Sequence, residues 1–173
     1  MDLTPRIEGL EAGAYLSGVD DNGRTLVIMG DHPNKLLDLC TAGPIFDCMS
    51  INASAEGVLF DYCATLHAAD VYNFVDSIHP ETTVIGLRCG CESKRVDMTI
   101  DAVPVGGTSA LFAVIAGLVL GYRDILLCGV RLEPGSVYHD EHVVANWNRW
   151  MPFIRGKVRL ECHGHNWLKD LLS

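Results

Sequence analysis

The feature that most constrains the fold is the stretch from Val105 to Arg131, VGGTSALFAVIAGLVLGYRDILLCGVR. It begins with two glycines and two hydroxyl residues, continues with a long apolar run as far as Gly121, and ends with a shorter apolar run, Ile125 to Cys128. This order predicts a loop, a buried helix, a short turn and a buried strand, which together make half of an α/β layer. The helix, expected from Ser109 to Leu120, is too short to span a bilayer, so we expect it in a protein core.

The start of this helix is a candidate ligand site. Gly106 and Gly107 let the backbone come close to a ligand, and Thr108 or Ser109 can cap the helix. The free N–H groups of a helix start attract an anion such as a phosphate or a carboxylate. The alternative is that the glycines and the cap only form a tight turn.

The rest of the chain repeats the alternation of strand and helix. Strands are expected at Thr25 to Met29, Phe46 to Ile51, Tyr62 to Leu66, Thr82 to Leu87 and Val158 to Glu161. Helices are expected at Lys35 to Cys40, Ala53 to Leu59, Ala68 to Ser77, Val143 to Phe153 with an interruption near Pro152, and Asn166 to Leu172. Arg88 to Val103 is expected to be an exposed loop or hairpin. The alternation predicts one three-layer, Rossmann-like α/β domain over residues 1–173, with a mainly parallel sheet and residues 1–24 as a surface lead-in.

The composition limits the classes of partner that we expect and indicates the cellular compartment. The chain has 22 acidic and 13 basic residues and a formal net charge of −9, so we expect no large nucleic-acid footprint, although a small anion can still bind. The N-terminus lacks the pattern of a signal peptide, and no stretch predicts a membrane span. Seven cysteines, several inside apolar runs, indicate reduced core residues rather than disulfides. We therefore expect a cytoplasmic protein.

Ligand-binding residues of an open parallel sheet gather where the strands end. Here those positions include Gly30, Asp31 and Pro33 after the first strand and Asn52 after the second. Together with the Gly107 loop, they predict two glycine-containing loops that face one another and hold the phosphate and ribose of a nucleotide. The dinucleotide motif G-x-G-x-x-G is missing from the sequence.

Histidines and cysteines suggest further chemistry. His67 follows an apolar strand and His139 lies in a polar segment after a core strand, so each is a candidate base, while a structural histidine and an ordinary loop are the alternatives. Cys89-Gly-Cys91 and the segment Cys162 to His165 resemble zinc ligands in residue type, but the C-x-C spacing fits a structural zinc site poorly, and we expect no metal. The G-x-S-x-G motif of hydrolases is missing.

Three segments together, TLVIMGDHPNKLLDL, FDCMSIN and GGTSALFAVIAGLVLGYRDILLCGV, resemble the pattern of the family 42 sialyltransferases. They are also similar to the related domain of bacterial motility-associated glycosylation factors. The C-terminal segment, NRWMPFIRGKVRLECHGHNWLKDLL, is similar to small phage and prophage proteins with a Rossmann-like layout. The resemblance covers most of the chain from residue 25 onward.

This resemblance implies roles for individual residues. Gly30, Asp31 and Pro33 would match the first nucleotide loop of the family, and Asn52 would match its ligand-contacting asparagine. Gly107, Thr108 and Ser109 would match the second loop, which in the family holds a cytidine nucleotide. His139 is the nearest candidate for the catalytic histidine of the family's lid region, most of which this shorter chain lacks.

Two functions remain open from the sequence. The first is a small phage-type glycosyltransferase-like enzyme that uses a nucleotide-sugar, with His139 or His67 as the base and the host cytoplasm as its location. The second is a non-catalytic protein that binds or sequesters a nucleotide or associates with itself. Ala110 and Arg131, which depart from the family pattern, and the missing lid favour the second. An apolar surface left without its lid is compatible with a homo-oligomer.

Overall fold

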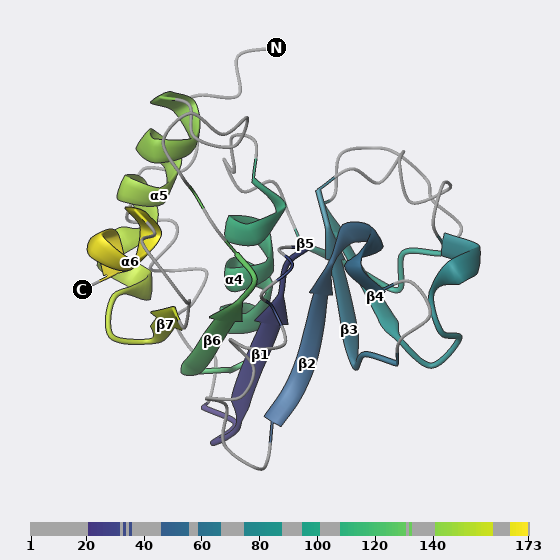
Figure 1. The fold of residues 1–173 in the computed structure, drawn as a ribbon. Helices are drawn as coiled ribbons and strands as arrows, with labels where there is room; N and C mark the ends of the chain where they lie inside the picture. The colour runs from purple at the N-terminus through teal and green to yellow at the C-terminus, as the bar shows by residue number, and fades with distance from the viewer. Residues whose placement is uncertain are drawn as a thin grey trace.

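A parallel β-sheet crosses the molecule from edge to edge (Figure 1). The computed structural model describes residues 21–31, 33, 35, 46–55, 59–66, 75–87, 95–100, 108–130, 132, 141–160 and 167–172. Within these ranges the sheet has seven strands: β1 Thr25–Met29, β2 Phe46–Ile51, β3 Tyr62–Thr65, β4 Thr83–Leu87, β5 Met98–Ile100, β6 Asp124–Cys128 and β7 Val158–Leu160. Their order is β5-β4-β3-β2-β1-β6-β7, and every pairing between neighbours is parallel. The predicted α/β class with a parallel sheet is confirmed.

Both faces of the sheet are buried, which explains why its central strands are continuous apolar runs. Alternate residues of β1 point to opposite faces, as in any strand. Leu26 and Ile28 join the larger core cluster with helix α4, whereas Val27 and Met29 join a second cluster with Phe60. A strand buried on one face only would alternate apolar and polar residues, and β1 does not.

Helix α4, Ser109–Val119, packs against the sheet and is buried on all sides from Leu111 to Leu118 (Figure 1). A Cβ atom at Gly117 would lie 2.6 Å from the Leu26 side chain and 3.1 Å from that of Ile125, so the glycine lets the helix approach β1 and β6 closely. The sequence predicted this helix within one residue of its observed end, because its apolar run is long and its cap is clear.

Helices α5, Glu141–Ile154, and α6, Trp167–Leu172, lie at the β7 side of the sheet (Figure 1). Two 3-10 turns complete the described elements. Turn η1, Asn52–Ala55, follows β2, and turn η2, Val75–Ser77, precedes β4. Trp147 and Trp150 of α5 are buried in the core. No helix in the described part of the chain is long and apolar enough to cross a bilayer.

The structure corrects the loop or hairpin expected from Arg88 to Val103. Residues 98–100 form strand β5, which pairs in parallel with β4 at the edge of the sheet. Among its three residues only Ile100 is buried, so the strand is too short to produce a period-two pattern. Asp97 fixes its start, because its backbone N–H donates to the Val84 carbonyl at 2.9 Å and its carboxylate accepts from the Val84 N–H at 2.8 Å.

Two helix predictions also need correction. Helix α5 continues through Pro152 to Ile154, because Pro152 is exposed near the end of the helix, where its missing N–H costs one hydrogen bond, while Met151 and Ile154 are buried around it. Of the helix expected from Ala53 to Leu59, residues 53–55 form part of the 3-10 turn η1, Leu59 is 58% exposed outside any helix, and residues 56–58 lie outside the described residues. Most of the helices expected at Lys35 to Cys40 and at Ala68 to Ser77 lies outside the described residues.

Candidate functional site

The strand order has a single reversal point in the described sheet. From β1 the chain proceeds outward through β2, β3, β4 and β5, and then returns through α4 to β6 on the other side of β1. In open α/β sheets, ligands bind outside the carboxyl ends of the strands at such a point. The carboxyl ends of β1, β2 and β6 and the start of α4 are therefore the place to look for a site.

The first residues at this edge are two glycines in backbone contact. Gly30, directly after β1, donates its N–H to the Cys128 carbonyl at 2.9 Å. A Cβ atom on Gly30 would overlap the carbonyl oxygen of Gly129, and Gly129 has a φ of +64°, which glycine adopts without strain. The lack of a side chain at Gly30 is therefore explained by the approach of β6, whether or not a ligand is also present.

Asp31 and Pro33 follow on the surface. The Asp31 side chain is 94% exposed and forms an ion pair with Lys35 at 3.8 Å, one helical turn further along. Pro33 is exposed in a turn. These residues lie beside the carboxyl edge, as predicted, but Asp31 is a solvated surface carboxylate.

Asn52 and Ser109 join the second strand to the helix. Nδ2 of Asn52 donates to Oγ of Ser109 at 3.1 Å, across 57 residues of sequence. Asn52 has a φ of +50°, a left-handed conformation that asparagine tolerates better than most residues. Its Oδ1 atom is buried and has no hydrogen-bond partner in the described part of the chain. A buried acceptor without a donor is uncommon and costs free energy unless water or a ligand supplies one.

The start of α4 has the cap that the sequence predicted. Oγ1 of Thr108 accepts from the Leu111 N–H at 3.4 Å, and the side chain is buried. Ser109 is the first helical residue, half-buried, and its hydroxyl contacts Asn52. A helix start with free backbone N–H groups thus lies directly against the end of β2.

Ser54 is a residue of this edge that the sequence reading missed. Its hydroxyl contacts the carbonyls of Ile51 at 2.7 Å and Met29 at 3.0 Å and also the Ile51 N–H at 3.0 Å, which ties the end of β2 to the end of β1. The signal was present, because serine two residues after an asparagine at a strand end is typical of a side-chain-stabilised turn.

The predicted site residues therefore divide into three groups, of which Asp31 and Pro33, exposed beside this edge, form the first. The structure brings Asn52 and Ser109 into contact, places Thr108 beside them and puts Gly30 on the same edge, at the end of the neighbouring strand. The remaining predicted residues, His67, Gly107 and His139, lie outside the described residues, as do Gly106 and Arg131.

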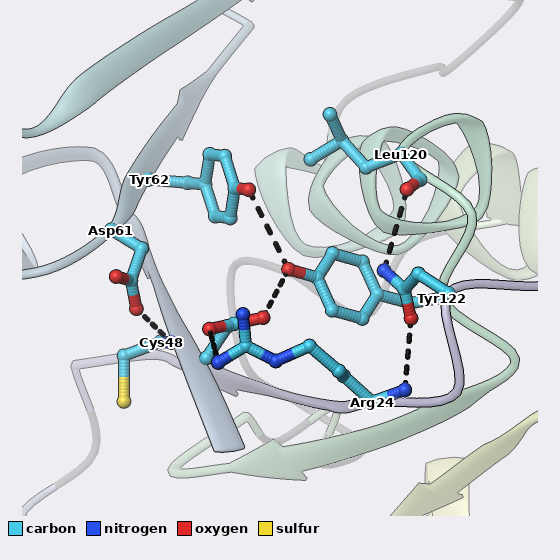
Figure 2. A network of polar contacts seen from close by, with 8 residues as sticks. Arg24, Cys48, Asp61, Tyr62, Leu120 and Tyr122 are labelled. Atoms are coloured by element: carbon cyan, nitrogen blue, oxygen red, sulfur yellow. Dashed lines mark hydrogen bonds and ion pairs between the residues drawn. The ribbon is translucent and has the colours of Figure 1, made fainter.

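A second polar network lies at the opposite, amino edge of the sheet (Figure 2). Asp47 of β2 is buried, forms an ion pair with Arg24 and accepts a hydrogen bond of 2.5 Å from the Tyr122 hydroxyl. The Tyr122 hydroxyl also lies 3.5 Å from that of Tyr62. Burial, and then the bond to Asp47, raise the pKa of Tyr122 well above its ordinary value, so the phenol stays protonated and donates.

This network stabilises the fold, and the sequence reading did not find it. Tyr122 follows α4 and precedes β6, whereas Asp47 lies in β2, 75 residues earlier. Asn22 adds a hydrogen bond next to this network, because its backbone N–H donates to the Gly121 carbonyl at 3.1 Å. The available signal was a charged residue inside the mostly apolar strand FDCMSI.

We expect Tyr122→Phe to lower the free energy of unfolding by about 1.5–3 kcal/mol, because it removes a buried hydrogen bond to a charged group. Urea denaturation at pH 7 measures the change. The matched control is Tyr62→Phe, which removes only the 3.5 Å contact and should cost less than about 1 kcal/mol. Equal losses for the two variants would contradict the assignment of the short bond to Tyr122.

Cys48 lies beside this network, and its thiol is half-buried. Burial, and then the negative charges of Asp61 and Asp47, raise the pKa of Cys48 from 9.0 to about 11. Since only the thiolate is nucleophilic, we expect Cys48 of the folded protein to react with iodoacetamide at pH 8.5 roughly 100-fold more slowly than in urea. Mass spectrometry of the peptide that contains Cys48 measures both rates, and similar rates would contradict the burial and charge assigned to it.

Metal ligation finds no support in the described ranges, where no group of three or more His, Cys, Asp or Glu residues is arranged to hold a metal ion. Cys48 and Cys63 are free thiols there. The segment Cys89 to Cys91 and the segment Cys162 to His165 lie outside the described residues.

The fold and this edge define an α/β protein with a parallel sheet and a polar pair at the carboxyl end of β2, the strand next to the switch point. Neither a protein-family model nor a curated protein nor a solved structure matches the chain significantly.

Proposed function

We propose that the protein binds a nucleotide or nucleotide-sugar at the carboxyl edge of the sheet, between the end of β2 and the start of α4, as a small glycosyltransferase-like protein of phage type. The observation that carries the proposal is the Asn52–Ser109 pair, in which a half-buried amide contacts the first residue of a helix and its buried Oδ1 has no partner among the described residues. The place agrees with the general rule for ligands of parallel sheets.

Charge supports the anionic class of ligand. The side chains at the described part of this edge, Asn52, Thr108 and Ser109, are uncharged, and the exposed carboxylate of Asp31 is paired with Lys35. The helix start adds a partial positive charge, so a phosphate meets an attractive field there in a protein whose net charge is −9. The resemblance to the family 42 sialyltransferases favours a cytidine nucleotide.

The same neutral set of side chains favours a second candidate, a nucleotide-binding protein without catalysis. Transfer to an acceptor hydroxyl needs a base, and none of Asn52, Thr108 and Ser109 is one. The candidate bases His67 and His139 come from the sequence alone. Incubation with a CMP-linked sugar separates the two functions: release of CMP supports the enzyme, whereas tight binding without turnover supports the binding protein.

The test of the shared claim is a thermal-shift screen against CMP, UMP, AMP, GMP and their sugar conjugates, with and without Mg²⁺. A ligand that binds only the folded state raises Tm by mass action. We expect one nucleotide class to raise Tm, and Asn52→Gly and Ser109→Ala to abolish the shift. The absence of a shift with every nucleotide would contradict the proposal.

A further inference from the structure

The turn before β1 contains the one Asn-Gly pair of the sequence, Asn22-Gly23. Both residues are exposed and lie outside any helix or strand. An asparagine followed by glycine is prone to deamidation, because the backbone nitrogen of the next residue can attack the side-chain amide and glycine has no Cβ atom to hinder the approach. The hydrogen bonds of the turn decide whether the fold promotes this reaction.

Two of these hydrogen bonds act on the reacting atoms themselves. The attacking nitrogen, the backbone N of Gly23, donates to Oδ1 of Asp21 at 2.8 Å. A general base must lie within about 2.6–3.2 Å of the atom whose proton it takes, so this carboxylate is in position. Oδ1 of Asn22 accepts from the backbone N–H of Arg24 at 2.9 Å. A donor there stabilises the negative charge that develops on this oxygen when the amide is attacked.

The remaining contacts attach the turn to the end of α4. The backbone N–H of Asn22 donates to the Gly121 carbonyl at 3.1 Å, and its Nδ2 donates to the Leu120 carbonyl at 3.4 Å, a long and weak bond that the leaving nitrogen can give up. Gly23 has a φ of +68°, and a Cβ atom there would meet nothing within 4 Å. The turn is therefore held in place, while the space beside Gly23 is open.

We propose that Asn22-Gly23 is a self-modification site, at which the folded chain converts asparagine into aspartate and isoaspartate faster than the unfolded chain does. The Gly23 nitrogen gives its proton to the Asp21 carboxylate and bonds to Cγ of Asn22. The bond from Cγ to Nδ2 breaks, and Nδ2 leaves as ammonia with a proton that solvent water relays from Asp21. Water then opens the succinimide at either of its two carbonyls, so water is the only co-reactant.

The product changes the attachment of β1. Both products carry a carboxylate in place of the amide, which cannot donate to the carbonyl of Leu120 and lies at the negative end of α4. Isoaspartate also adds a methylene group to the main chain just before Arg24, whose side chain pairs with Asp47. The reaction is independent of the proposed nucleotide site, because this turn precedes β1 at the amino edge of the sheet.

The experiment follows the mass of one tryptic peptide while the full-length protein is incubated at pH 7.4 and 37 °C. Residues 7–24 form a single tryptic peptide with one asparagine and no glutamine, so its conversion from amide to acid reports Asn22 alone. The same peptide, synthesised, gives the rate of the unfolded chain. Asn148 is the control within the protein, because it is exposed but lies in helix α5, where the backbone is held in the helical ladder.

Two variants of Asp21 separate the proton transfer from the shape of the turn. Asp21→Asn keeps an oxygen that can accept from the Gly23 N–H but cannot take its proton, and Asp21→Ala removes both functions. We expect each to slow the reaction of Asn22 in the folded protein roughly 10- to 100-fold. In the synthetic peptide each should change the rate less than about twofold, because the unfolded chain does not hold the carboxylate against the nitrogen. Thermal denaturation checks that both variants fold, and fragmentation of the peptide assigns the modified residue.

The proposal predicts that the folded wild type reacts faster than the synthetic peptide, that both Asp21 variants lose this advantage, and that Asn148 stays unmodified. A folded wild type that reacts no faster than the peptide would overturn it, since the turn would then protect Asn22. An unchanged rate in either folded Asp21 variant would overturn it as well, because the carboxylate would not be the base.

Discussion

Replacing Gly30 by alanine is expected to lower the free energy of unfolding by about 3 kcal/mol or more. The new Cβ atom would overlap the Gly129 carbonyl oxygen and lie 3.0 Å from its carbon. Both are backbone atoms at the ends of paired central strands, so neither can move without disturbing the β1–β6 ladder. The clash cannot be relieved by a rotamer change, which is why we expect a large effect from one methyl group.

Gly156→Ala is the matched control for this substitution. Gly156 has a φ of +78°, and a Cβ atom there would meet nothing within 4 Å, so the change tests backbone strain without a clash. We expect it to cost about 1–2 kcal/mol, measured by the same urea denaturation. If Gly30→Ala lowers the free energy of unfolding no more than Gly156→Ala does, the close contact between Gly30 and the Gly129 carbonyl does not exist in solution. The glycine at position 30 would then need another explanation.

The second large effect is expected from Trp147→Ala, which should destabilise the protein by about 3–5 kcal/mol. Trp147 is completely buried on α5 and belongs to the core cluster that α5 shares with α4. Its Nε1 has no hydrogen-bond partner among the described residues, so the contacts that they show for the indole are packing contacts. Alanine leaves a cavity between the helix and the sheet that the surroundings fill only partly.

Arg149→Ala provides the control on the same helix, because Arg149 is exposed. We expect it to change the free energy of unfolding by less than about 0.5 kcal/mol. Thermal or urea denaturation of both variants measures the difference between the two faces of α5. A loss below about 1 kcal/mol for Trp147→Ala would show that α5 is not packed on the core as described.

The fold was predictable from the sequence because its central elements are long or strongly apolar. Strands β1, β2 and β6 and helix α4 lie within one residue of their expected bounds. The elements that were missed are those that tertiary contacts create or maintain. Strand β5 is too short to be recognised without its partner β4, and α5 continues past Pro152 because the residues around the proline are buried.

The candidate site was predictable only in part. Asn52 and Ser109 were chosen as strand-end and helix-start residues, and the structure adds that they are in contact. The pairing of Gly30 with Gly129 and the bond from Tyr122 to Asp47 join segments far apart in sequence, and no local pattern encodes such contacts. The strand order that places the switch point between β1 and β6 is likewise a property of the whole chain.

The most direct test of the central claim is a nuclear magnetic resonance titration of the ¹⁵N-labelled protein with the nucleotide that gives the largest thermal shift, or with CMP if none does. The claim predicts that the largest shift changes occur at the Asn52 side-chain amide, the Ser109 backbone N–H and Gly30, at the carboxyl edge. It also predicts that Arg24 and Tyr122, at the amino edge, remain unchanged (Figure 2). Changes centred on Arg24 and Tyr122, or none up to millimolar nucleotide, would contradict the claim.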